Sequence, residues 1–197
     1  MRNLLLIPLL ATSLPFATAQ AAPADMPETG QTICSDASGA TVDCANTGQD
    51  GEHRAGVPWP NPRFTVGSGG TAECVIDNLT GLMWMRAPSS LDAANWANAL
   101  ANSNNLTLCG FSDWRLSNVR ELESLIHSGS ENGLAYLTNQ GFNVVQGSQN
   151  YWTSTSNASV GPRNTRAGWV ITLDQGFIYT TNSKSAPYFY WPVRGGR

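Results

Sequence analysis

The sequence predicts an α+β domain in which two short helices lie among many short strands. Residues 90–102 and 118–126 carry apolar side chains at the spacing of a helix with one buried face. Two leading strands precede them, and a tryptophan-rich series of short strands follows. Leading strands, a pair of helices and a run of strands are together typical of the α+β class.

Residues 1–19 have the pattern of a signal peptide that is cleaved on export. Arg2 precedes an apolar run over residues 4–14, and Ala17-Thr18-Ala19 is a small-residue cleavage site, with Ala21 as the second choice. The apolar run is too short to span a bilayer, and no later run is long enough. We therefore expect an exported protein without a membrane span, located in the periplasm, at the cell surface or outside the cell.

The chain that remains after cleavage is acidic and contains few charged residues. Without Arg2, ten of the 11 basic residues stand against 14 acidic ones, a formal net charge of 10 − 14 = −4. Charged residues make up 13% of the sequence, against about 25% in average proteins. Because a nucleic-acid-binding domain normally has a basic surface, this balance argues against a nucleic-acid partner.

Four cysteines remain after export, and an even number in an oxidising compartment predicts disulfide bonds. Three pairings are possible. The pairs that we favour are Cys34–Cys44, which would close a turn-rich segment, and Cys74–Cys109, which would join the first core strand to a glycine turn. A metal site is the weaker interpretation, because both histidines are distant from any cysteine pair in the sequence.

Residues 20–62 are rich in Pro, Gly, Asp and Thr and show no apolar periodicity. Within them, Thr29-Gly30-Gln31 recurs as Thr47-Gly48-Gln49. Composition alone does not separate a docked arm from a flexible tether. Because a disulfide would add little to a disordered chain, we expect a partly ordered N-terminal arm, followed by a globular domain over residues 63–197.

The domain opens with short strands, which we place at 63–66, 74–77 and 82–85, with a turn at 78–81. Ser89 and Asp92 have the spacing of a capping box, so the first helix should begin near Ser90. Its predicted buried stripe consists of Ala93, Trp96, Ala97 and Leu100.

A glycine turn, a short strand at 114–116 and the second helix follow one another within residues 109–126. Asn118 and Glu121 have capping-box spacing and predict the start of that helix, with Ser117 as the other possible cap. This compact series of elements is architectural rather than catalytic.

Several motif residues are expected to have structural roles. We expect Asp113 to be a turn or buried carboxylate that pairs with Arg115 or Arg120. The full structural set is Trp84, Trp96, Gly110, Asp113, Trp114, Arg115, Glu121, Trp152 and Trp169.

Beyond His127 the pattern predicts only short strands and loops. Residues 151–155 alternate as a strand does, and 168–173 with 177–180 predict a hairpin. The final strand, 191–194, contains a proline, which predicts an edge position or a strand end.

At Asp77-Asn78-Leu79-Thr80-Gly81-Leu82-Met83-Trp84 and Gly110-Phe111-Ser112-Asp113-Trp114-Arg115-Leu116, the chain resembles the Lcl C-terminal domain family, found at the end of a bacterial collagen-like adhesin. The resemblance implies a C-type-lectin-like fold with two helices and a loop-rich antiparallel β region. It also implies ligand binding at the surface or in the periplasm, and adhesion to glycans. Ser117 stands where the family usually has proline, which should loosen the helix start slightly. The sequence has no Gly-X-Y tract, so trimerisation does not carry over.

Enzymatic interpretations find little support in the sequence. It contains no Gly-x-Ser-x-Gly, His-Glu-x-x-His or phosphate-binding glycine loop. A formylglycine-generating type of enzyme, which shares the fold class, requires reactive cysteines, and we expect all four to be paired. The Glu-Pro-Asn and Trp-Asn-Asp motifs of calcium-dependent lectins are also missing. We therefore expect neither catalysis nor a cofactor.

Cations and aromatic residues concentrate in the last third of the chain. We predict a ligand-binding surface there for acidic or sulfated glycans, since cations attract the anionic groups and aromatic faces suit sugar rings. The predicted ligand-binding residues are Arg163, Arg166, Tyr179, Lys184, Tyr188 and Tyr190. The alternative is a structural or protein-interaction module of the envelope that uses its C-terminal loops to bind a partner protein.

Overall fold

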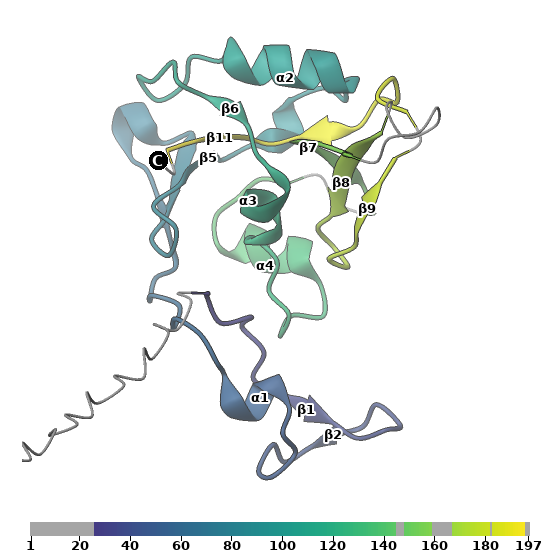
Figure 1. Cartoon of the computed structure of the whole chain (residues 1–197). Coiled ribbons are helices and arrows are strands. Elements are labelled where there is room, and N and C mark those ends of the chain that lie inside the picture. The colour runs from purple at the N-terminus through teal and green to yellow at the C-terminus, as the bar shows by residue number, and fades with distance from the viewer. Residues whose placement is uncertain (1–25, 145–147, 159–166, 182, 196–197) are drawn as a thin grey trace, which may run out of the picture.

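The computed structural model describes residues 26–144, 148–158, 167–181 and 183–195, and its elements confirm the α+β class. Two β-sheets form the centre of the domain. Figure 1 shows helix α2 (Trp96–Asn104) on one side of them, and helices α3 (Val119–Glu123) and α4 (Gly133–Asn139) on the other. The arrangement is compatible with a C-type-lectin-like fold. The predicted signal peptide lies outside the described residues.

The larger sheet has five antiparallel strands in the order β3-β4-β5-β11-β6. They are β3 (Phe64–Val66), β4 (Cys74–Asp77), β5 (Met83–Met85), β6 (Arg115–Leu116) and β11 (Pro192–Arg194). Because β11 lies between β5 and β6, the edge position predicted for it is wrong. Pro192 is tolerated because it is the first residue of its strand, which is the other position that the sequence suggested.

The smaller sheet has the order β10-β7-β8-β9. Its strands are β7 (Asn150–Ser156), β8 (Gly168–Thr172), β9 (Ile178–Thr180) and β10 (Phe189–Tyr190). The predicted hairpin is confirmed as β8 and β9, which pair antiparallel. β10 runs parallel to β7, an exception to the antiparallel pairing expected from the sequence. The outermost strand, β9, has one long side without a neighbouring strand among the described elements.

Helix α2 begins at Trp96 rather than near Ser90. Its N-cap is Asn95, whose side chain accepts a hydrogen bond from the third residue of the helix. The chain before this cap is extended because Ala94 exchanges two backbone hydrogen bonds with Tyr188, at 2.9 and 3.0 Å. Pairing with a distant segment therefore overrides the local capping pattern, and only a short 3₁₀ turn, η2 (Pro88–Ser90), forms at the predicted start.

The buried face of α2 also differs from the predicted stripe. Ala99 and Ser103 are buried, whereas Ala93 and Ala97 are exposed. The helix packs this small-residue face on β6 and β7. None of the helices in the described ranges is long and apolar enough to cross a membrane.

The capping box predicted for α3 is present. Asn118 accepts hydrogen bonds from two helical N–H groups, and Glu121 accepts one from the Asn118 N–H at 2.8 Å. Glu121 also accepts two hydrogen bonds from Arg115, at 2.6 and 2.7 Å, and these raise the pKa of that guanidinium. Asp113 is exposed and pairs with Arg194 (2.7 Å), so its predicted arginine partners are wrong. Its true partner lies in β11, far along the chain.

Helix α4 corrects the expectation that only strands and loops follow His127. Asn132 caps it by accepting a hydrogen bond from the Ala135 N–H at 3.0 Å. Leu134 and Leu137 are its buried residues. It begins at Gly133, where a Cβ would lie 2.1 Å from the Leu173 carbonyl oxygen, so only glycine fits against the β8–β9 turn.

The tryptophans organise two packed clusters. The larger cluster centres on Trp191, which contacts Trp84 edge-on at 5.7 Å between ring centroids and donates its indole N–H to the Met85 carbonyl. The smaller cluster lies between α2 and the smaller sheet and contains Trp152 and Tyr190. Both clusters are built from segments that lie far apart in the sequence.

Both favoured disulfides are confirmed. Cys74–Cys109 joins β4 to the turn before β6. Cys34–Cys44 lies in the N-terminal arm, which forms strands β1 (Cys34–Ser35) and β2 (Thr41–Val42), helix α1 (Asp50–His53) and a separate lobe at the bottom of Figure 1. A second 3₁₀ turn, η1 (Gly69–Thr71), lies between β3 and β4.

The arm is docked on the domain through an aromatic junction. The Trp59 ring lies 3.9 Å from the Arg63 guanidinium and contacts the His127 and Tyr136 rings, with centroids at 4.9 and 6.2 Å. In addition, the Ser128 N–H donates to a carbonyl of the arm, that of Thr29, at 3.0 Å. The arm is thus ordered over residues 26–62, and it contacts the domain through Thr29 and Trp59.

Candidate ligand-binding surfaces

The predicted ligand-binding residues do not form one surface in the described part of the chain. Arg163 and Arg166 lie outside the described residues. Tyr190 is 3% exposed, and its hydroxyl accepts a hydrogen bond from the Asn102 amide at 3.1 Å, so it is a packing residue and its assignment to the ligand surface is wrong. The half-buried Tyr188 ring packs on Trp152, with centroids 4.9 Å apart.

Lys184 marks one end of the smaller sheet. Its ammonium lies 3.7 Å from the centroid of the Trp96 ring and donates a hydrogen bond to the Ser156 hydroxyl at 2.7 Å. Ser156 pairs with Gly168, so this is the end at which β7 finishes and β8 begins. Lys184 is therefore a fixed cation at the sheet end from which the predicted loop with Arg163 and Arg166 departs.

Two exposed aromatic residues lie at the other end of the same sheet. Phe177 is 60% exposed and directly precedes β9, and Tyr179 is 40% exposed within it. Side chains two residues apart in an extended chain share a face. The Tyr179 hydroxyl donates a hydrogen bond to the Asn150 side-chain oxygen, which ties the outer strand to β7. Tyr179 is among the residues predicted for the ligand surface and Phe177 is not, although the alternation around Ile178 places both on one face.

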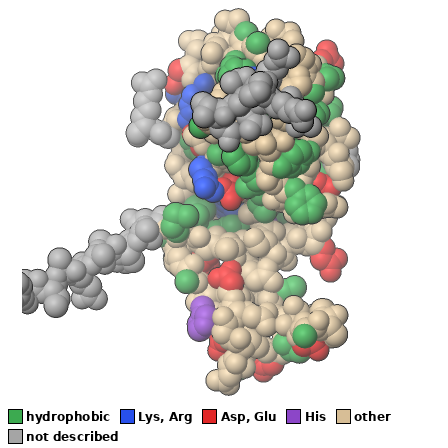
Figure 2. Space-filling model, turned by 45° about the vertical axis from the view of Figure 1, so that its right-hand side comes forward, with side chains coloured by type: hydrophobic (Ala, Val, Ile, Leu, Met, Phe, Trp, Pro, Cys, Tyr) green, Lys and Arg blue, Asp and Glu red, His purple; other side chains and the backbone are tan. Residues whose placement is uncertain are grey.

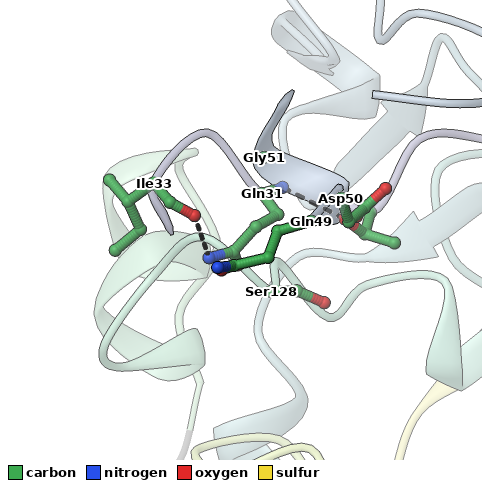
Figure 3. A pocket seen from close by; sticks show the side chains of 7 residues that line it. Gln31, Ile33, Gln49, Asp50, Gly51 and Ser128 are labelled. Carbon is green, nitrogen blue, oxygen red and sulfur yellow. Dashed lines mark hydrogen bonds between the residues drawn. The ribbon is translucent and has the colours of Figure 1, made fainter. Parts of the chain in front are cut away.

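One cavity lies where the arm meets the domain, a second lies within the domain, and the two share Ser128 in their walls. The first, of about 340 Å³, is lined mainly by arm residues; Figure 3 shows the Gln31 and Gln49 side chains lying next to each other in it. The second, of about 360 Å³, lies between the 126–133 segment and the turn that joins β8 to β9. Neither cavity was predicted from the sequence.

The first cavity accounts for the repeated Thr-Gly-Gln motif. In both copies the glutamine N–H donates to the threonine hydroxyl, at 3.1 and 3.2 Å, and the glycine has positive φ, +82° and +69°. Each glutamine then donates its side-chain amide to a carbonyl at strand β1, Ile33 for Gln31 and Ser35 for Gln49, both at 2.9 Å. The two copies therefore bond to the same extended segment, at carbonyls two residues apart.

All four cysteines are in disulfides, so none supplies the free thiol that formylglycine-type catalysis requires. Across the described ranges, no three His, Cys, Asp or Glu side chains are grouped closely enough to hold a metal ion. Figure 2 shows hydrophobic side chains gathered over the domain on this face, and acidic ones around the arm lobe at the bottom.

The comparisons with known proteins agree with this architecture. Residues 73–194 match the family model of the Lcl C-terminal domain, a range that runs from the start of β4 to the end of β11. No curated protein matches the chain significantly. The matched range includes the smaller core, most of the larger core, α2 to α4 and the exposed aromatic residues Phe177 and Tyr179, and it leaves out β3 and the arm.

Proposed function

Since the chain belongs to the Lcl C-terminal domain family, we propose that it is an exported, non-enzymatic binding domain whose ligand is a glycan. The observation that carries this proposal is the exposed aromatic pair formed by Phe177 and Tyr179 on the outer strand of the smaller sheet. The signal-peptide pattern and the two disulfides support export.

The aromatic pair has the composition of a sugar-binding surface. Phe177 offers an apolar ring, and Tyr179 combines a ring with a hydroxyl that is already oriented by Asn150. Ligand sites typically combine apolar and aromatic area with a few fixed polar groups. A sugar ring that packed its C–H face on these two aromatic rings would cover their apolar surface. Its hydroxyl groups could then form hydrogen bonds with the Asn150 side chain and with water.

Lys184 supports a preference for acidic or sulfated glycans. Its ammonium is held in place at the opposite end of the same sheet from the aromatic pair. A ligand that extends along the sheet would therefore contact the aromatic rings at one end and the cation at the other. Attraction of this kind weakens as salt screens the charges.

Glycan-array binding and calorimetry on the mature chain test the proposal. Phe177→Ala and Tyr179→Ala should each weaken glycan binding by roughly tenfold, the equivalent of one lost aromatic contact. Ile76→Ala, at an apolar residue exposed on β4, is the matched control and should leave binding unchanged. Lys184→Ala and Arg166→Ala should reduce the salt dependence. A folded double variant of Phe177 and Tyr179 with wild-type affinity would refute the assignment.

The second candidate function is docking to an envelope protein. The observation in its favour is that β9 is the outermost strand of its sheet and carries exposed apolar side chains, and such a strand is a template for pairing with another chain. Co-purification of one envelope protein together with a blank glycan array would favour this function over the first.

A further inference from the structure

The outer edge of the smaller sheet is an uncharged strand without the usual protection. β9 is the last strand in the order β10-β7-β8-β9, and Figure 1 shows it at the outside of the domain, with β8 on its inner side. Proteins commonly protect such an edge with a charged side chain, a proline or a bulge. Residues 176–181 contain no charged residue and no proline, and the pairing of β9 with β8 is continuous in register. The edge is therefore open to another strand.

The hydrogen bonds to β8 show which backbone groups of β9 point outward. The Phe177 carbonyl accepts a hydrogen bond from β8 at 2.9 Å, and the Thr181 N–H donates one to the residue at the start of β8 at 3.0 Å. In an antiparallel pair, residues that bond to the neighbouring strand alternate with residues whose backbone groups point away from it. The N–H and C=O groups of Ile178 and Thr180 therefore point to the outer side, where no described strand pairs with them.

A second copy of β9 satisfies these groups in a single register. When two β9 strands pair antiparallel about an axis at Tyr179, Ile178 of each copy lies opposite Thr180 of the other. Both are then hydrogen-bonded pairs, and each such pair exchanges two backbone hydrogen bonds. The two four-stranded sheets become one continuous sheet. An interface of this kind uses the same surface on both copies, as the twofold interfaces of homodimers do.

The charges at the two ends of β9 favour this antiparallel arrangement. Asp174 lies in the turn before the strand, and Glu131 lines the same cavity as Asp174, so this end is acidic. Lys184 lies beyond the other end and makes it basic. Asp174 and Lys184 are each five residues from Tyr179, so an axis at Tyr179 brings the acidic end of one copy to the basic end of the other. A parallel pairing would bring like charges together.

We propose that β9 is the interface of a homodimer, in which two copies pair this edge antiparallel through Ile178 and Thr180. The interface is small, so the dimer is reversible, with a Kd of roughly 10 μM. Tyr179 lies at the axis and shares a face with Phe177, so the aromatic pairs of the two copies lie on one face of the joined sheet. The dimer does not depend on what the aromatic pair binds. While it is formed, it excludes an envelope protein from this edge.

Analytical ultracentrifugation of the mature chain, from about 1 to about 300 μM, tests the assignment. We expect monomer at the lowest concentration and dimer at the highest. Amide exchange measured by NMR locates the interface. The Ile178 and Thr180 amides should exchange roughly tenfold more slowly at the highest concentration. The Thr181 amide, which bonds to β8 in both states, should not change.

Two variants of Thr180 disrupt the edge without removing a hydrogen bond to β8. Thr180→Pro removes the outward N–H, and an edge strand accepts proline where its N–H faces solvent. Thr180→Lys places a charge on the edge and does not depend on the folding of the first variant. Each should weaken dimerisation by at least about tenfold. Thr41→Pro and Thr41→Lys, at an exposed residue of β2 in the arm, are the matched controls and should leave dimerisation unchanged.

Cross-linking tests the register. An axis at Tyr179 makes Tyr179 and its copy a non-hydrogen-bonded pair, in which Cα atoms lie about 4.5 Å apart, within the range of a disulfide. Tyr179→Cys should therefore give a disulfide-linked dimer on air oxidation, whereas Thr41→Cys should not.

Four results would overturn the proposal: monomer at every concentration, a dimer without slower exchange at Ile178 and Thr180, wild-type dimerisation of both Thr180 variants, or no cross-link through Tyr179→Cys. The glycan proposal fails separately. A monomer that binds glycans through Phe177 and Tyr179 would refute only the dimer, and a dimer with a blank glycan array would refute only the glycan assignment.

Discussion

Replacing Trp59 with alanine should loosen the arm without unfolding the domain. The indole N–H donates to the Glu28 carbonyl at 2.7 Å, a hydrogen bond worth about 1 kcal/mol. The Arg63 guanidinium 3.9 Å above the ring adds about 1 kcal/mol. The edge contacts with His127 and Tyr136 add about 1 kcal/mol together. Because the bond to Glu28 lies within the arm, only the other two contributions act on docking, and the expected loss is about 2 kcal/mol, or roughly thirtyfold in the docking equilibrium.

Hydrogen exchange measures this loss directly. The Ser128 amide bonds to the arm carbonyl of Thr29 and therefore reports on docking, whereas the Val57 amide bonds to that of Met26 and reports on the internal structure of the arm. The Ser128 amide should exchange roughly thirtyfold faster in the alanine variant, while amides of β7 and β8 should not change. Trp59→Phe is the matched variant and should lose less, because it keeps a ring but not the indole N–H.

Two outcomes would refute this reasoning. Unchanged exchange at Ser128 would mean that the aromatic junction does not hold the arm. Equal acceleration in β7 and β8 would mean that the arm and the domain unfold as one unit.

Three further predictions concern other links in the structure. Replacing Cys74 and Cys109 with alanine should reduce the free energy of unfolding by about 4 kcal/mol, the chain-entropy value for a separation of 35 residues, and urea titration would show it. In the same assay, Glu121→Ala should lower the free energy of unfolding by about 2–3 kcal/mol, because it removes both a helix cap and a bidentate ion pair with Arg115. Glu123→Ala is the control: it removes only an exposed ion pair with Arg120, so it should lower the free energy of unfolding by under about 1 kcal/mol. Burial, and secondarily the nearby arginine of the junction, hold the pKa of His127 below its usual 6.5, and its Nδ1 accepts the Gly129 N–H only when unprotonated. As pH falls below about 6.5, His127 therefore takes up a proton in the undocked state before it does so in the docked state. Docking should weaken over this range, until the pH has fallen below the lower pKa that His127 has in the docked state. The exchange rate of the Ser128 amide should report this pH dependence, and His127→Gln should remove it.

Local patterns predicted the elements whose causes are local. β4 occupies the predicted residues 74–77, and α3 begins at the predicted cap, because a strand alternation and a capping box act within a few residues. The first helix was misplaced because Ala94 bonds to Tyr188, a partner that no local window contains. α4 was missed because Leu134 and Leu137 alone are too short a stripe to show periodicity.

The candidate sites were predictable only in part for a related reason. Tyr179 and Lys184 are on the surface as an aromatic and cationic count suggests, but Tyr190 belongs to the same stretch and is buried under α2. The two cavities could not be seen in the sequence, since each is lined by segments that lie far apart in it. The first forms where the arm meets Ser128, and the second forms where residues 126–133 meet the turn between β8 and β9.

The position of β11 has a consequence for the order in which the domain folds when the chain emerges N-terminus first. β5 and β6 are neighbours in the sheet only through β11, and Trp191, directly before it, fills the centre of the larger core. A chain that emerges in this direction presents every other strand of the domain before it presents this one. We therefore expect the core to close only after residues 191–194 have emerged. A chain truncated after Tyr190 should remain protease-sensitive across β3 to β6, and protection there would disprove this order of events.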